Sequence, residues 1–180
     1  MDFGRGDDGR LFFAVVPEPG AAAQIHRLAR ILKYAHRFGG RPIERGRLHV
    51  TLLFLGGFSR PLLRMAREAA SEVRMPPFEM SFDRTASFRG RPGNRPLVLV
   101  GNEALKRRVK SLRQSLGAAL RRKGLKGFAH RQFTPHLTLL YGEHEVDEYP
   151  VVPFGWTVNE FVLIHSLHGH AHLARWRLGV

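Results

Sequence analysis

The 180-residue chain contains no cysteine, which excludes disulfide bonds, thiolate metal ligands and cysteine nucleophiles together. Long apolar runs are also absent, and none approaches the ~18 residues of a membrane-spanning helix. The glycine patterns GxGxxG and GxxxxGK[ST] do not occur, so ATP-dependent enzymes of the usual kinds lose their main support. The first ten residues lack the apolar segment of a secretory signal, and the cytoplasm is therefore the expected location.

Acidic residues are scarce. The chain has 15 Asp and Glu against 29 Lys and Arg, which gives a formal net charge of +14. Such a field attracts polyanions, RNA or DNA among them. A basic surface also keeps many proteins soluble without any such partner, so the charge alone does not identify what the protein binds.

The spacing of apolar residues predicts the order of the secondary structure elements. The clearest helix covers 103–123, because its apolar residues fall on one face and its basic residues on the others. The predicted order is strand, helix, strand, helix, strand, strand, helix, strand, strand, strand, and the last two strands (157–166 and 172–178) form a hairpin. The length suits one domain over residues 10–180, acting as a monomer, with residues 1–9 as a frayed lead-in.

Two strands carry the same unusual pattern. The segment HVTLLF begins at His49, and HLTLLY begins at His136. Because side chains two residues apart on a strand share a face, His49 projects with Thr51, and His136 projects with Thr138. The intervening aliphatic residues point into the core and anchor each pair. We expect both pairs to face one cleft; the alternative is two histidines that are satisfied within a core.

In-line displacement at phosphorus suits this set of residues. The reaction needs a base on the attacking oxygen and an acid on the leaving oxygen, and histidine can serve in either role near neutral pH. Threonine hydroxyls can donate hydrogen bonds to the non-bridging phosphoryl oxygens, where negative charge develops. The pattern therefore favours a phosphodiester with an internal leaving alcohol, such as a 2′,3′-cyclic phosphate on RNA.

The paired motifs HVTLLFLG and HLTLLYG, with RLFFAV near the start and FVLIHSLHGHAHLARWRL at the end, resemble the two-histidine (2H) phosphoesterase superfamily. In particular, they resemble its bacterial and archaeal 2′-5′ RNA ligase / RNA 2′,3′-cyclic phosphodiesterase family. The resemblance covers residues 10–178. It implies a bilobal α+β fold with pseudo-twofold symmetry, in which antiparallel sheets line a central cleft and helices lie outside.

The resemblance also implies roles for individual residues. His136 would act as base toward water, His49 as acid toward the leaving 3′ oxygen, and Thr51 and Thr138 would hold the phosphate, with no cofactor and no metal. Relatives often have an arginine at the position of Tyr141 and another basic residue near Leu53. Arg131, five residues before His136, is a candidate to replace that contact with the substrate.

Three aromatic residues are candidates to stack on a base near the cleft, namely Phe13, Phe54 and Tyr141. For the two phenylalanines, packing in the core is the favoured alternative.

The C-terminal segment HSLHGHAH is rich in histidine, which is a composition that can bind zinc or nickel. The run crosses a predicted turn, and neither aspartate nor glutamate lies within it to complete a site. A surface hairpin is therefore the favoured interpretation of His165, His168, His170 and His172.

The sequence thus predicts a metal-independent RNA 2′,3′-cyclic phosphodiesterase that produces 2′-phosphates, with 2′-5′ ligation as an additional activity. Its predicted partner is RNA or a nucleotide with a 2′,3′-cyclic phosphate, and no binding to membranes is expected. Two alternatives stay open: a phosphodiesterase of small cyclic nucleotides or 2′-5′ oligonucleotides, and a non-catalytic basic RNA-binding module. Intact His-x-Thr pairs count against the latter, because binding alone requires no pair of titratable imidazoles.

Overall fold

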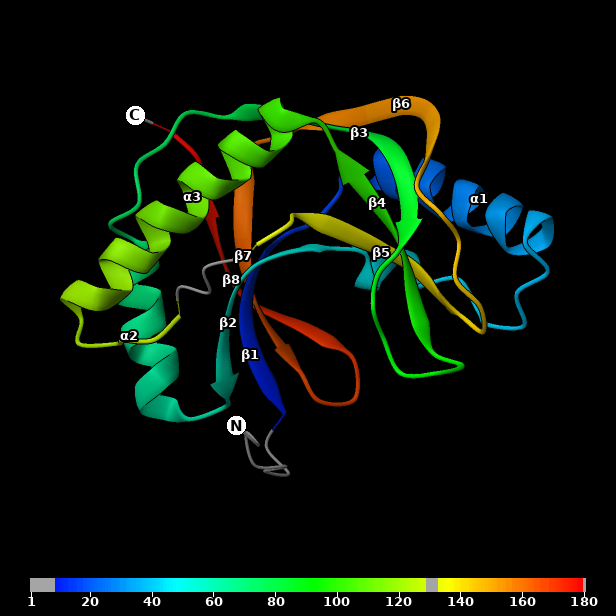
Figure 1. Cartoon of the computed structure of the whole chain (residues 1–180). Coiled ribbons are helices and arrows are strands. Elements are labelled where there is room, and N and C mark those ends of the chain that lie inside the picture. Colours follow the sequence, from blue (N-terminus) through cyan, green and yellow to red (C-terminus); the bar gives the residue numbers. More distant parts are fainter. Residues whose placement is uncertain (1–8, 129–132, 180) are drawn as a thin grey trace.

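The computed structural model describes residues 9–128 and 133–179, and it is built around one antiparallel sheet of eight strands (Figure 1). The predicted lead-in over 1–9 lies, apart from Gly9, outside the described residues. The elements are β1 (Arg10–Val15), α1 (Pro19–Ala35), a short 3₁₀ helix (Arg45–Arg47), β2 (Val50–Gly57), α2 (Arg60–Ala70), β3 (Phe78–Ser87), β4 (Arg95–Gly101), α3 (Glu103–Arg122), β5 (His136–Gly142), β6 (Tyr149–Val158), β7 (Glu160–Ser166) and β8 (His170–Arg177).

The strand order is β6-β3-β4-β5-β2-β1-β7-β8, so that β5 and β2 meet at the centre. One half of the sheet is β2-β1-β7-β8 and the other is β5-β4-β3-β6. The innermost strand of each half belongs to a His-x-Thr motif. β5 begins at His136, and β2 begins at Val50, one residue after His49. The expected α+β fold with pseudo-twofold symmetry is confirmed, as two halves of one continuous sheet.

Two of the helices begin directly after a side chain that caps them. Ser59 accepts a hydrogen bond from the amide of Leu62 at the start of α2, and Asn102 accepts one from the amide of Leu105 at the start of α3. The apolar face predicted for α3 is confirmed, because the following residues are all buried: Leu105, Val109, Leu112, Leu116 and Leu120. In Figure 1, α1 lies at one end of the molecule, and α2 and α3 lie together at the other.

β6 is absent from the predicted order, which has no strand between the His136 strand and the strand at 157–166. The structure instead ends β6 at Val158 and begins β7 at Glu160. Pro150 and Pro153 conceal β6 in the sequence, because proline donates no hydrogen bond to a ladder. β6 is an edge strand paired only with β3, and an edge is the place where a sheet tolerates proline.

Of the helices in the described part, none has the length and apolar character needed to cross a membrane.

Candidate active site

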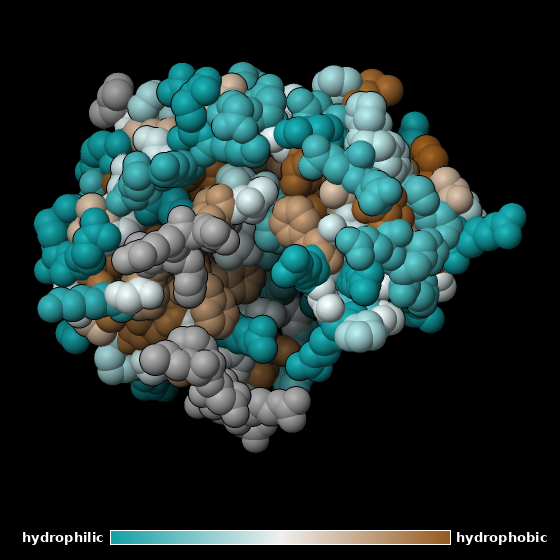
Figure 2. Space-filling view, in the orientation of Figure 1, coloured by the Kyte–Doolittle hydropathy of each residue, from teal (hydrophilic) through white to brown (hydrophobic). Residues whose placement is uncertain are grey.

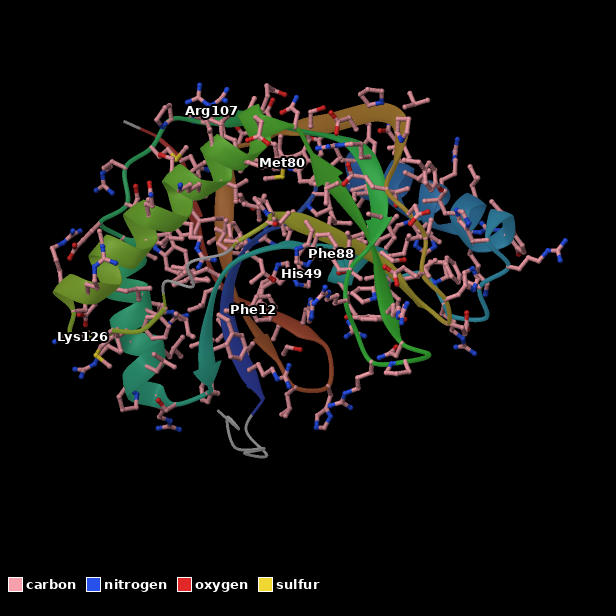
Figure 3. All side chains as sticks on the ribbon, viewed as in Figure 1. Phe12, His49, Met80, Phe88, Arg107 and Lys126 are labelled. Carbon is pink, nitrogen blue, oxygen red and sulfur yellow. The ribbon has the colours of Figure 1, made fainter. Side chains whose placement is uncertain are left out.

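One pocket of about 390 Å³ lies over the centre of the sheet, and all four residues of the two motifs line it: His49, Thr51, His136 and Thr138. The prediction that both pairs face one cleft is therefore correct. Hydrophilic residues cover most of the face in Figure 2, while hydrophobic residues gather toward its middle and lower left. Figure 3 shows His49 near the centre of the molecule, with Phe12 and Phe88 close to it in the view.

The two histidines are held in the same way. Nδ1 of His49 lies 2.8 Å from the carbonyl oxygen of Arg47, and Nδ1 of His136 lies 2.9 Å from that of Thr134. A carbonyl oxygen can only accept, so Nδ1 donates its proton in both rings. Nε2 is then left on each ring as the nitrogen that can give or take a proton. Each bond spans two residues, so the local backbone alone fixes the tautomer.

Aromatic rings confine both imidazoles. The ring of Phe12 lies 5.2 Å from that of His49, and the ring of Phe88 lies 4.9 Å from that of His136. The pKa of His49 is lowered from its ordinary value of 6.5, chiefly by burial, and its hydrogen bond to Arg47 opposes this only in part. Electrostatic repulsion from His136, Arg47 and His172 lowers this pKa further. In the free protein, His49 is therefore more readily neutral than an exposed histidine.

A β-bulge follows the threonine in each motif strand. Thr51 pairs with Ala14 of β1 while Leu53 pairs with Phe13, so that Leu52 is an extra residue in β2. In β5, Thr138 pairs with Val98 of β4 while Leu140 pairs with Leu97, so that Leu139 is extra. Beyond each extra residue the alternation of side chains is shifted by one, so a side chain that would have faced the core faces the pocket, and the reverse.

The bulges bring Phe54 and Tyr141 to the pocket. Strict alternation would place Leu53 and Leu140 on the face of the motif side chains, but both leucines are buried in the core. Phe54 is 39% exposed and Tyr141 is 44% exposed, and both line the pocket. Each ring follows its histidine by five residues, so the pocket has an aromatic side chain from each half.

The carbonyl of each extra residue is bound from outside its strand. Leu139 accepts a hydrogen bond of 2.7 Å from the amide of Ile43. Leu52 accepts one of 3.1 Å from the guanidinium of Arg113 in α3. The same guanidinium stacks over the ring of Phe133, 4.1 Å from its centroid. Arg113 thus connects the bulge of β2 to the segment that leads into His136.

Of the four predicted substrate contacts, Phe54 and Tyr141 line the pocket as expected, whereas Phe13 does not. Phe13 is fully buried and packs against Phe161 and Trp176 in the core. The prediction that it stacks on a base is wrong, because it lies on the face of β1 opposite the pocket, which its neighbour Phe12 lines instead. Arg131 lies outside the described residues.

Several residues of the pocket were not identified from the sequence. Arg10 and Arg47 line it and supply positive charge on the side of β1 and β2. His170, on the edge of the C-terminal hairpin, also lines it, as do Phe12, Ile43 and Ser166. The predicted hairpin is confirmed, since β7 and β8 pair across the turn at 167–169. Within residues 9–128 and 133–179, no group of three or more His, Asp or Glu side chains is arranged to hold a metal ion.

Two imidazoles and two hydroxyls that converge from twin strands of an antiparallel sheet define a two-histidine phosphoesterase. A family model described as the 2′-5′ RNA ligase superfamily matches residues 17–170, and the chain belongs to that superfamily.

Individual relatives agree with the family. The chain is 30% identical over 178 residues to an Escherichia coli protein named RNA 2′,3′-cyclic phosphodiesterase. The aligned region covers 94% of this chain and 96% of the relative. The chain is 29% identical over 130 residues to an Archaeoglobus fulgidus protein of the same name, which covers 72% and 70%. Among solved structures, that of E. coli LigT complexed with 3′-AMP superposes with a TM-score of 0.72 at 29% identity, over 94% of this chain and 98% of that one.

Proposed function

We propose that this protein hydrolyses RNA 2′,3′-cyclic phosphate ends to 2′-phosphates without a metal ion. The observation that carries the proposal is the matched tautomer of His49 and His136, each with Nδ1 bound to a carbonyl and Nε2 left to act. A histidine pair held in this way, within one pocket, meets the requirement of in-line displacement for a base and an acid. The activity named for the relatives from two organisms supports the same reaction.

In the proposed step, the oxygen of water attacks phosphorus while His136 Nε2 takes its proton. The bond between phosphorus and the 3′ oxygen breaks, and Nε2–H of His49 gives its proton to that oxygen. Thr51 and Thr138 donate to the non-bridging oxygens as their negative charge increases. Burial lowers the pKa of His49 and so disfavours the protonated form that an acid requires. The negative charge of the bound phosphate acts in the opposite direction and stabilises that form. If the 5′-hydroxyl of a second RNA attacks phosphorus in place of water, the same step breaks the bond to the 3′ oxygen and gives a 2′-5′ linkage.

RNA is the proposed partner because positive charge reaches the pocket itself. Arg10 and Arg47 line it, within a chain of net charge +14. We propose that they supply the positive charge that the family resemblance leads one to expect at the position of Tyr141 and near Leu53. Both His-x-Thr motifs of the pocket lie on the same chain, and we propose that the monomer is the active unit.

Phe54 and Tyr141 are proposed to stack on bases at the two sides of the phosphate. Phe54→Ala and Tyr141→Ala are each expected to raise KM for a short RNA at least about fivefold, because base stacking on an aromatic ring contributes about 1 kcal/mol or more. The value of kcat should change much less, since neither ring bears a proton in the reaction. Steady-state kinetics would check this, with Tyr34→Ala as control because Tyr34 is 72% exposed and lies on α1 outside the pocket. Unchanged KM in both pocket variants would show that the bases do not reach these rings.

Product analysis of a short RNA that ends in a 2′,3′-cyclic phosphate tests the proposed function directly. The expected product carries only a 2′-phosphate, and the rate is expected to be the same with and without EDTA, because no proposed step uses a metal ion. A 3′-phosphate product would contradict the proposed cleavage of the bond to the 3′ oxygen. Loss of activity on chelation would contradict the two-histidine mechanism.

A second candidate function is hydrolysis of small cyclic nucleotides or 2′-5′ oligonucleotides. The pocket volume of about 390 Å³ favours it, because this lies near the lower end of the range for small-molecule sites. The two functions differ in salt dependence: affinity for RNA should fall steeply between low and physiological salt, whereas affinity for a mononucleotide should change little.

A further inference from the structure

His170 places a third imidazole in the pocket, on the side of His49. It is the first residue of β8, directly after the turn of the C-terminal hairpin. Its ring centroid lies 4.9 Å from that of His49, with the two planes inclined at 72°, and 5.6 Å from that of Phe12. His49 is thus in contact with Phe12 and with His170, and all three line one pocket.

The hydrogen bonds of His170 indicate where its proton lies. Nδ1 is buried and has no hydrogen-bond partner within the described residues. A buried N–H without an acceptor loses its hydrogen bond to water, so the proton is favoured on the other nitrogen. Because His170 lines the pocket and only its Nδ1 is buried without a partner, Nε2–H is the group that a molecule in the pocket can reach.

The surroundings of His170 disfavour a positive charge. Its pKa is lowered to about 4, first by burial and then by the positive charges of His49, Arg47 and His172. A group with a lowered pKa is uncharged above that value, so His170 stays neutral around neutral pH. It can then donate a hydrogen bond near neutral pH without itself taking up a proton.

The second half of the sheet has a different neighbour for its histidine. The ring next to His136 is that of Phe88, at 4.9 Å, which has no hydrogen-bonding group. The two motifs therefore match in their threonines and in their tautomers, but among the described residues only His49 has a second imidazole in ring contact with it. A phosphate whose leaving 3′ oxygen takes a proton from His49 lies within reach of the imidazole that contacts His49.

We propose that His170 is a third substrate-contacting imidazole, whose Nε2–H donates a hydrogen bond to a phosphoryl oxygen on the His49 side of the pocket. This inference rests on the proposed function for the identity of the substrate. His170 transfers no proton and breaks no bond. It adds one fixed donor to those of Thr51 and Thr138, and it makes the near-symmetric site unequal on its two sides.

The test compares His170→Phe with His170→Gln on an RNA with a 2′,3′-cyclic phosphate end. Phenylalanine keeps a planar ring against His49 but has no donor, and it is expected to lower kcat/KM about tenfold, the value of one hydrogen bond. Glutamine can place an amide N–H near the position of Nε2 and should recover most of that loss. His168→Ala, in the same hairpin but outside the pocket lining, is the control and should behave as the wild type. Circular dichroism and thermal unfolding check that each variant is folded.

Binding of inorganic phosphate, measured by calorimetry, separates this inference from the proposed function. If the wild type does not hydrolyse the RNA but binds phosphate more tightly than His170→Phe does, the proposed function fails and the contact stands. If the wild type is active and His170→Phe equals it in both rate and phosphate affinity, the contact is overturned and the function stands. Equal losses in the phenylalanine and glutamine variants would also overturn it, since packing rather than a donor would then be responsible. Nitrogen-15 NMR of the imidazole provides an independent check, because a proton on Nδ1 of His170 would contradict the assignment.

Discussion

His49→Ala and His136→Ala are each expected to lower kcat/KM for a 2′,3′-cyclic phosphate RNA on the order of a hundredfold or more, because each removes a group that transfers a proton. The double variant is expected to be little worse than either single one, since groups that act in one concerted step do not contribute additively. Initial rates of the three variants measure this. His49→Gln and His136→Gln are the matched controls: they retain a polar side chain that cannot titrate, so they should be as inactive as the alanine variants.

The pH dependence adds a second measurement on the same residues. A bell-shaped profile is expected, because one histidine must be neutral and the other protonated. Since burial lowers the pKa of His49 below 6.5, His49 loses its proton at lower pH than an exposed histidine. As the proposed acid, His49 must be protonated, so activity falls as the pH rises through its pKa. The alkaline limb of the kcat/KM profile should therefore lie below about pH 6.5. Full activity in either alanine variant, or a flat profile between about pH 5 and pH 8, would exclude the two-histidine mechanism.

Thr51→Val and Thr138→Val are expected to raise the activation free energy by about 1 to 3 kcal/mol each, because each removes one donor to a developing negative charge. Valine has nearly the shape of threonine and suits a strand, so the fold should be retained. The loss should appear in kcat/KM. Thr51→Ser and Thr138→Ser keep the hydroxyl and should retain most of the activity. Valine and serine variants of equal activity would show that these hydroxyls do not bind the phosphate.

The sequence predicts the centre of the site well because it depends on local regularities. Alternation along a strand is sufficient to place His49 with Thr51 and His136 with Thr138, and the pocket contains all four. The sequence also proposes Phe54 and Tyr141 as aromatic residues near the cleft, and both line the pocket, but strict alternation along the strand does not place them there. Leu52 and Leu139 form bulges within runs of aliphatic residues, without a glycine to indicate them, so alternation would place the following aromatic residues on the wrong face.

The remaining omissions depend on contacts between segments that are distant in sequence. His170 lies in a histidine-rich turn, and only the pairing of β7 with β8, and of β7 with β1, brings it beside His49. Arg113 belongs to a helix face rich in basic residues, and nothing in its spacing indicates that it binds the carbonyl of Leu52. The strand β6 is concealed because its prolines are acceptable only at an edge, and the position of an edge is a property of the assembled sheet.

The junction between the two halves of the sheet has a consequence for stability. β2 and β5 share a single register pair, Val50 with Leu137, whereas strands within each half pair over most of their length. The histidines approach the pocket from opposite sides of this narrow junction, so their separation depends on the angle between the halves. A phosphate held by both imidazoles acts as a non-covalent cross-link across the junction. Part of its binding free energy therefore stabilises the folded chain, and bound substrate or product raises the resistance of the whole molecule to unfolding.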